Sequence, residues 1–164
     1  MDERTTLSDA IEVTGMVSPN EDDVMFTGAV RWRLFDADGT TVEEGCVDNL
    51  VVNSGRAFLA ARCIASGKPP ISHLAVGSSA TPTGLGNIAL AVETARVALA
   101  ASTSAGAVVS CSAVVPAGVG TGTVEEVGLF NSGLAGDMIS RALTGTITKP
   151  AGLGLQFAWT LTVN

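Results

Sequence analysis

Two adjacent carboxylates, Glu125 and Glu126, follow three glycines at alternate positions and are the first residues in the sequence that could do chemistry. A pair of carboxylates can work as general acid and base, and a glycine-rich loop can hold a phosphate where it leads into a helix. Here the glycines lead into a valine-rich run typical of a strand, and no Lys-Ser or Lys-Thr pair follows. Because neighbouring side chains of a strand point to opposite faces, the two glutamates cannot converge on one reacting group. We therefore expect a strand with its turns at residues 120–133, with one glutamate facing solvent and the other a subunit contact or a strand end.

The other residues that could do chemistry fit structural roles better. The only histidine, His73, lies in the apolar segment ISHLAV, without a G-x-S-x-G turn, and we expect a core or interface residue hydrogen-bonded to backbone. The DADG segment, residues 36–39, predicts a hairpin turn and not a calcium loop, because Val47 occupies the place of the final acidic ligand. The sequence predicts no catalytic, cofactor-binding or metal-binding residue, and no enzyme.

The three cysteines, Cys46, Cys63 and Cys111, are widely spaced and form no C-x-x-C motif. This spacing argues against a zinc site and against a complete set of disulfides within one chain. We expect three small buried side chains. The alternative is a disulfide between subunits, through Cys46, Cys63 or Cys111, formed after release into an oxidising medium.

Composition and charge restrict the class of protein. The chain has 164 residues, which predicts one domain, and only 15% of them are charged, so we expect a partner to cover part of the surface. The net charge of −7 argues against nucleic-acid binding, which depends on lysine and arginine. No apolar run reaches the roughly 18 to 20 residues of a membrane span. The N-terminus lacks the pattern of a secretory signal, so we expect the protein to stay in a cytoplasm-like compartment until it is assembled.

Alternating apolar residues from Val24 to Leu34 predict a half-buried strand, and a second strand at about residues 41–47 completes a hairpin. The segment SGRAFLAARCIAS predicts one helix at about residues 54–66, with Ser54 as its N-cap and Gly67 followed by prolines as its end. Because apolar residues surround most of this helix, we expect it to be buried on more than one side.

The rest of the chain predicts strands and glycine-rich turns. Residues 92–99 could form a helix or a strand, and the neighbouring pattern favours the strand. Alternation predicts that Ile139, Leu143 and Ile147 share one face, and that Trp159 lies in the core. Together these elements predict an all-β protein, an antiparallel, jelly-roll-like β-sandwich at residues 24–164, preceded by an acidic N-terminal arm at residues 1–23.

The segments NLVVNSGRAFLA, HLAVGSSATP and VEEVGLFN, in this order, resemble a family of small structural proteins of tailed-bacteriophage virions. These are usually described as tail-fibre-like or collar-fibre-like, and the resemblance covers about residues 34–163. It implies a self-associating β-sandwich module of the neck, the collar or the tail-fibre attachment region, with capsid decoration as the alternative. Such a protein is assembled in the host cytoplasm and ends in the virion.

The partners that the resemblance implies are further copies of the chain, in a trimer or a ring, and other virion proteins. The acidic arm is then a candidate docking segment that orders on binding. A competing hypothesis from another class is a carbohydrate-binding module with Trp32 or Trp159 as its aromatic platform. Two tryptophans and no tyrosine make such a platform sparse.

Overall fold

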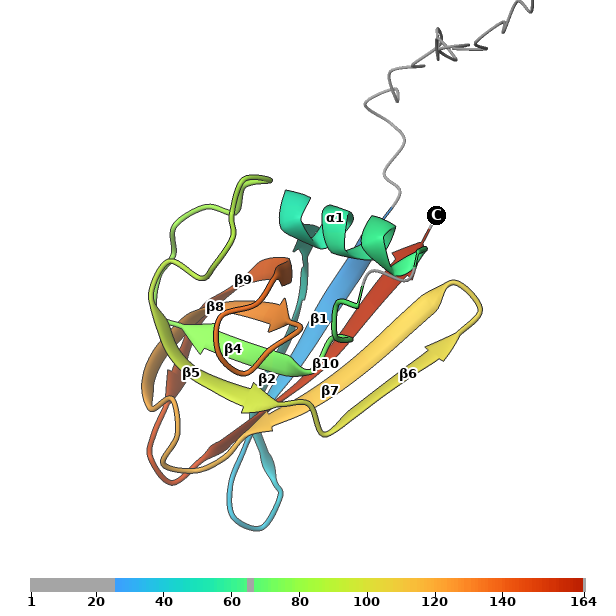
Figure 1. Ribbon diagram of the computed structural model, residues 1–164. Coiled ribbons are helices and arrows are strands. Elements are labelled where there is room, and N and C mark those ends of the chain that lie inside the picture. Colours follow the sequence, from blue (N-terminus) through green and yellow to red (C-terminus); the bar gives the residue numbers. More distant parts are fainter. Residues whose placement is uncertain (1–25, 65–66, 164) are drawn as a thin grey trace, which may run out of the picture.

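The computed structural model describes residues 26–64 and 67–163, so the expected arm at residues 1–23 lies outside the described residues. The described residues form two five-stranded antiparallel sheets packed as a sandwich, with one short helix (Figure 1). The elements are β1 (Phe26–Phe35), β2 (Thr41–Asp48), β3 (Leu50–Val51), α1 (Asn53–Arg62), β4 (His73–Gly77), β5 (Glu93–Ala98), β6 (Ala101–Ala105), β7 (Val108–Val115), β8 (Gly122–Phe130), β9 (Met138–Lys149) and β10 (Gly154–Val163). The predicted fold class is confirmed, with two strands more than an eight-stranded jelly roll.

The first sheet has the strand order β2-β1-β10-β7-β6, and the second has the order β3-β9-β8-β4-β5. The last strand, β10, lies beside the first, so Phe26 pairs with Val163 across the sheet. Every pairing is antiparallel between the strands of each sheet. The ambiguous segment at residues 92–99 is a strand, β5, which confirms the interpretation that the neighbouring pattern favoured.

The core lies between the two sheets, where alternate side chains of facing strands meet. On β1 the predicted alternation is confirmed, because Val30, Trp32 and Leu34 are buried. Trp159 on β10 is also buried in this cluster, as predicted. The hairpin between β1 and β2 turns at Gly39, which has a φ of 82°, a backbone conformation that glycine adopts without steric cost.

The helix differs from its prediction in length and burial. It begins at Asn53 after Val52 as N-cap, and Ser54 donates its hydroxyl to the carbonyl of Met138 at 2.7 Å instead of capping the helix. It ends at Arg62, before the predicted end at residue 66. Only one face is buried, at Gly55 and Phe58, because α1 lies across one end of the sandwich with its other faces outside (Figure 1).

The predicted common face of Ile139, Leu143 and Ile147 is wrong for Leu143. The pairing of β8 with β9 shifts register between Val124 and Glu126, so Leu143 lies opposite Glu126. Cross-strand partners share a face of the sheet. Ile139 and Ile147 belong to the core cluster, whereas Leu143 is half-buried on the other face of the second sheet.

Candidate functional site

The most deeply buried ion pair of the described residues joins Glu126 on β8 and Arg141 on β9. Nε of Arg141 donates to Oε2 of Glu126 at 2.9 Å, and Nη2 of Arg141 lies 2.8 Å from the same oxygen as the closest contact of the ion pair. The two side chains are buried, with 0% and 1% of their surface exposed. Buried charges persist in proteins where they are paired and hydrogen-bonded, and this pair meets both conditions.

The carboxylate of Glu126 also binds the loop at residues 78–92, which covers the outer face of the second sheet. The backbone N–H groups of Ala91 and Val92 donate to it at 3.0 and 2.8 Å. A small apolar cluster lies on the same outer face and contains Val52, Ala75, Leu90, Phe130 and Met138. Glu126 therefore holds the end of this loop onto the sheet.

Arg141 binds the beginning and the middle of the same loop. Its Nη2 donates to the carbonyl of Thr81 at 2.8 Å, and its Nη1 donates to the carbonyl of Pro82 at 3.2 Å and to Oδ1 of Asn87 at 3.0 Å. All three nitrogens of the guanidinium thus have partners within the chain. The ion pair has the geometry of a structural clamp and leaves no group directed at a substrate.

Glu125 and Glu126 do not form an acid pair, because they have no partner in common. Glu125 accepts a hydrogen bond from the hydroxyl of Thr146 at 3.0 Å, whereas Glu126 binds Arg141 and the amides of Ala91 and Val92. The expectation that one glutamate faces a subunit contact or a strand end is wrong for Glu126, which is buried within its own chain. The sequence contains one indication of the ion pair, because Arg141 is the only charged residue in the apolar segment MISRAL and a buried arginine needs a partner of opposite charge.

A second buried charge, Lys149, was not predicted. It is the last residue of β9 and is 1% exposed, and its Nζ donates to the carbonyl of Pro116 at 2.9 Å. Burial lowers the pKa of Lys149 below its ordinary value, because it disfavours the charged form. A lysine directly before a proline turn is usually exposed, so the sequence carried no signal for its burial.

His73 begins β4 and is half-buried. Its Nδ1 and the hydroxyl oxygen of Ser72 form a hydrogen bond of 2.8 Å. The prediction of a backbone partner is therefore wrong, because this partner is a side chain. A Cβ at Gly133 would lie 2.7 Å from Nε2 of His73, which means that the ring packs against the loop after β8. The ring therefore fits a packing role.

Both tryptophans are buried, with Trp32 at 7% and Trp159 at 1% exposure. Sugar-binding platforms present the face of an aromatic ring to solvent. Neither ring is available for this, so carbohydrate binding through Trp32 or Trp159 conflicts with their positions in the core.

The cysteines differ in exposure. Cys111 is buried as expected, but the expectation is wrong for Cys46 and Cys63, which are exposed. Cys46 lies on β2 at the edge of a sheet, and Cys63 follows the last residue of the helix. Burial also raises the pKa of Cys111, which disfavours its reactive thiolate. A disulfide between subunits would therefore use Cys46 or Cys63.

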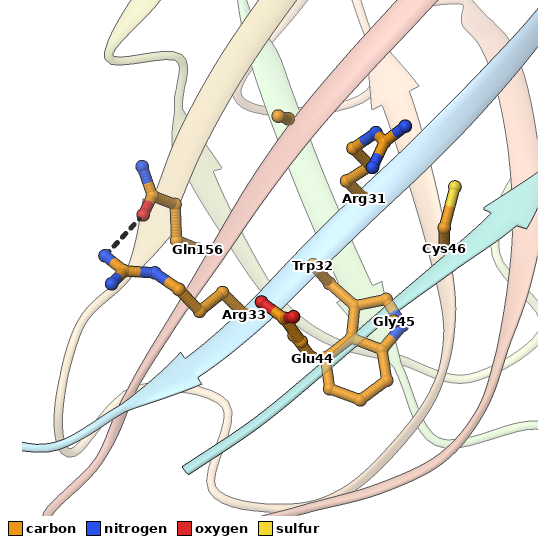
Figure 2. A pocket seen from close by; sticks show the side chains of 8 residues that line it. Arg31, Trp32, Arg33, Glu44, Gly45, Cys46 and Gln156 are labelled. Carbon is orange, nitrogen blue, oxygen red and sulfur yellow. Dashed lines mark hydrogen bonds between the residues drawn. The ribbon is translucent and has the colours of Figure 1, made fainter. Parts of the chain in front are cut away.

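An open hollow of about 480 Å³ lies on the first sheet, lined by residues of β1, β2 and β10 that include Arg31, Arg33, Glu44 and Cys46 (Figure 2). Arg33 is held in place, because its Nη2 donates to Oε1 of Gln156 at 2.9 Å. The guanidinium groups could attract an anionic group, but Glu44 lies in the same hollow with the opposite charge. Such an open, mixed-charge surface lacks the enclosure typical of a small-molecule site.

The outer face of β10, β7 and β6 is the most distinctive surface of the described residues. No charged residue occurs between Arg96 and Glu125 or after Lys149, so none of these three strands carries a charge. The register aligns small side chains in rows across the strands. The rows are Ala158, Ser112 and Ala101, followed by Thr160, Ser110 and Thr103, and all six are exposed or half-buried.

Within residues 26–64 and 67–163, no group of three or more histidine, cysteine or acidic side chains is placed to hold a metal ion. No helix of the described residues is long and apolar enough to cross a membrane. Comparison of the chain with protein-family models, with curated proteins and with solved structures finds no match.

Proposed function

We propose that the chain is a structural protein of a bacteriophage virion, assembled in the host cytoplasm. It acts as a self-associating module of the neck, the collar or the tail-fibre attachment region and docks on neighbouring virion proteins. The observation that carries this proposal is the exposed, charge-free face of β10, β7 and β6. The resemblance of the segments NLVVNSGRAFLA, HLAVGSSATP and VEEVGLFN to virion proteins supplies the biological setting.

A charge-free face of small side chains is suited to permanent contact. Burying it requires no desolvation of charges, which costs several kilocalories per mole for each ion. Alanine loses no rotamer freedom on burial and the short serine and threonine side chains lose little, in contrast with lysine or glutamate. A sheet with short side chains can therefore pack closely against another sheet or extend through its edge.

The internal contacts of the chain support a role based on shape. The ion pair of Glu126 with Arg141 fixes a loop of the chain itself, and Lys149 binds a backbone carbonyl. These buried charges make their contacts within the chain itself, and the function proposed for the sandwich is to present rigid surfaces to its neighbours. The acidic segment at residues 1–23 is the proposed docking segment for another virion protein.

Mass spectrometry of purified phage particles tests the assignment directly. We expect peptides of this chain in mature particles, and cross-links to neck or tail proteins. Cross-links mainly to the major capsid protein would identify a decoration protein instead. Light scattering of the isolated chain should give a mass that is a multiple of 16.5 kDa, with a trimer or ring as the expected assembly. Absence of these peptides from particles would refute the assignment to the virion, and a monomer at all concentrations would refute self-association.

A further inference from the structure

The two sheets have four edge strands, and three of them carry features that prevent pairing with another strand. Edge strands are protected by charges, irregularities or short length. β2 carries Glu43, Glu44 and Asp48 and has a register shift against β1. β3 has only two residues. β5 has a register shift against β4 and carries the ion pair of Glu93 with Arg96, at 2.6 Å.

The fourth edge strand, β6, has none of these features. Its five residues, Ala101–Ala105, include no charge and no proline, and all five are exposed. It pairs with β7 without a register shift. It forms the outer strand of its sheet, so one row of its backbone N–H and C=O groups is directed away from β7 (Figure 1). This edge is ready to accept a further antiparallel or parallel strand.

The sequence of β6 identifies the strand that fits. Ala-Ser-Thr-Ser-Ala reads the same in both directions around Thr103. An antiparallel partner with the same sequence would place Thr103 opposite Thr103, Ser102 opposite Ser104 and Ala101 opposite Ala105. Around a two-fold axis the same patch serves both copies, so every residue of β6 would face an identical, small and uncharged side chain.

We propose that β6 pairs antiparallel with β6 of a second copy of this chain, around a two-fold axis at Thr103. The pairing joins the first sheet of one copy to the first sheet of the other. Because each of these sheets has five strands, the result is one continuous sheet of ten strands. It rests on the self-association of the proposed function and names the contact through which it occurs. A two-fold contact closes after two copies, so a trimer or ring needs a further contact elsewhere on the chain.

The chemistry of both faces of β6 agrees with this partner. Thr–Thr and Ser–Ser pairs across antiparallel strands are favourable, whereas like charges directly opposite each other are not. β6 places no charge on either face, and the adjoining groove contains apolar residues such as Phe58, Leu59 and Ile71. Because only five residues pair on each side, we expect a dimer that dissociates on dilution.

Site-directed cross-linking tests the two-fold axis. In a background in which Cys46→Ser and Cys63→Ser remove the exposed thiols, Thr103→Cys should give a covalent dimer with mild oxidation or a short bis-maleimide. The matched control is Thr160→Cys, on the same face but two strands away from the edge. Efficient cross-linking at Thr160 with none at Thr103 would overturn the β6 pairing and indicate contact through the face.

A charged edge gives the second test. Thr103→Lys places two lysines opposite each other on the axis and should halve the mass measured by light scattering at the same concentration. Val42→Lys, on the opposite edge of the same sheet, should leave the mass unchanged. An unchanged mass in Thr103→Lys would overturn the pairing but not the proposed function. Absence of the chain from phage particles, with the pairing intact, would refute only the proposed function.

Discussion

Replacing Glu126 by glutamine should destabilise the protein strongly, because one buried carboxylate accepts three hydrogen bonds and balances the charge of Arg141. Oε2 accepts from Ala91 N and from Nε of Arg141 and lies 2.8 Å from Nη2 of Arg141, and Oε1 accepts from Val92 N. Glutamine has a single acceptor oxygen, and its NH2 group would face a donor in either orientation. Arg141 would also remain buried without its counter-charge, and leaving one partner of a buried pair costs about 3–5 kcal/mol.

A loss of about 3–5 kcal/mol is large against the roughly 5–15 kcal/mol that stabilises a typical domain. Urea unfolding followed by tryptophan fluorescence measures it, since Trp32 and Trp159 are buried and report on the core. The matched control is Glu93→Gln, which breaks the ion pair with Arg96, where the glutamate is 32% exposed. There we expect a loss of about 0–1 kcal/mol.

Hydrogen exchange separates the loss of the loop clamp from a general loss of stability. In Glu126→Gln the amides of Ala91 and Val92 should exchange much faster than amides of the core strands. The double variant Glu126→Leu with Arg141→Met removes both charges but also the partners of the loop, so fast exchange at residues 78–92 should persist. If Glu126→Gln costs no more than Glu93→Gln and the loop amides stay protected, the ion pair does not hold the loop.

Three further predictions concern other buried groups. The first is that the stability of Lys149→Met, measured relative to the wild type, should be higher at neutral pH than at pH 10. Because the pKa of Lys149 is lowered in the native state, the unfolded state binds more protons, and wild-type stability rises with pH between the native and the unfolded pKa. A difference between the two urea midpoints that does not change with pH would contradict this. A maleimide should label Cys46 and Cys63 in the native protein and Cys111 only after unfolding, counted by mass spectrometry; three fast thiols would disprove the burial of Cys111. Gly55→Ala should lower the free energy of unfolding by about 1–3 kcal/mol or more, since a Cβ there would collide with the carbonyl of Ile139. The control Ala57→Ser, at an exposed position of the same helix, should lower it by about 0.5 kcal/mol. Equal shifts of the melting temperature would contradict the close packing of α1 on β9.

The sandwich could be predicted because the inner faces of the two sheets are buried against each other. Alternation with a period of two then appears directly in the sequence, as in Val30, Trp32 and Leu34 on β1. Alternation fails where the pairing shifts register, and the position of Leu143 opposite Glu126 is such a case. A shift depends on both strands of a pair, so the pattern of one strand alone does not contain it.

The helix and the cysteines show a second limit. The apolar residues of α1, alanines among them, are spread around the circumference of the helix, which suggested burial on several sides. Alanine is, however, also the best helix former on an exposed face. Composition alone does not separate these cases, and the structure buries only Gly55 and Phe58 of this helix. Cysteine is also ambiguous in the sequence, because its usual burial depends on the neighbours that the fold supplies. Cys46 is exposed because β2 is an edge strand with few neighbours.

Charge is distributed along the chain in a way that separates two kinds of contact. Residues 1–23 contain seven acidic residues and one arginine, which leaves nine acidic and eight basic residues in residues 24–164. Almost all of the net charge of −7 therefore belongs to the acidic segment, and the sandwich is close to neutral. Copies of the sandwich would meet little electrostatic repulsion, so the proposed pairing through the charge-free β6 edge would depend on backbone hydrogen bonds and small side chains. The acidic segment, as the proposed docking segment, would instead attract a basic surface on another protein, and salt should weaken this attraction but not the proposed pairing through β6.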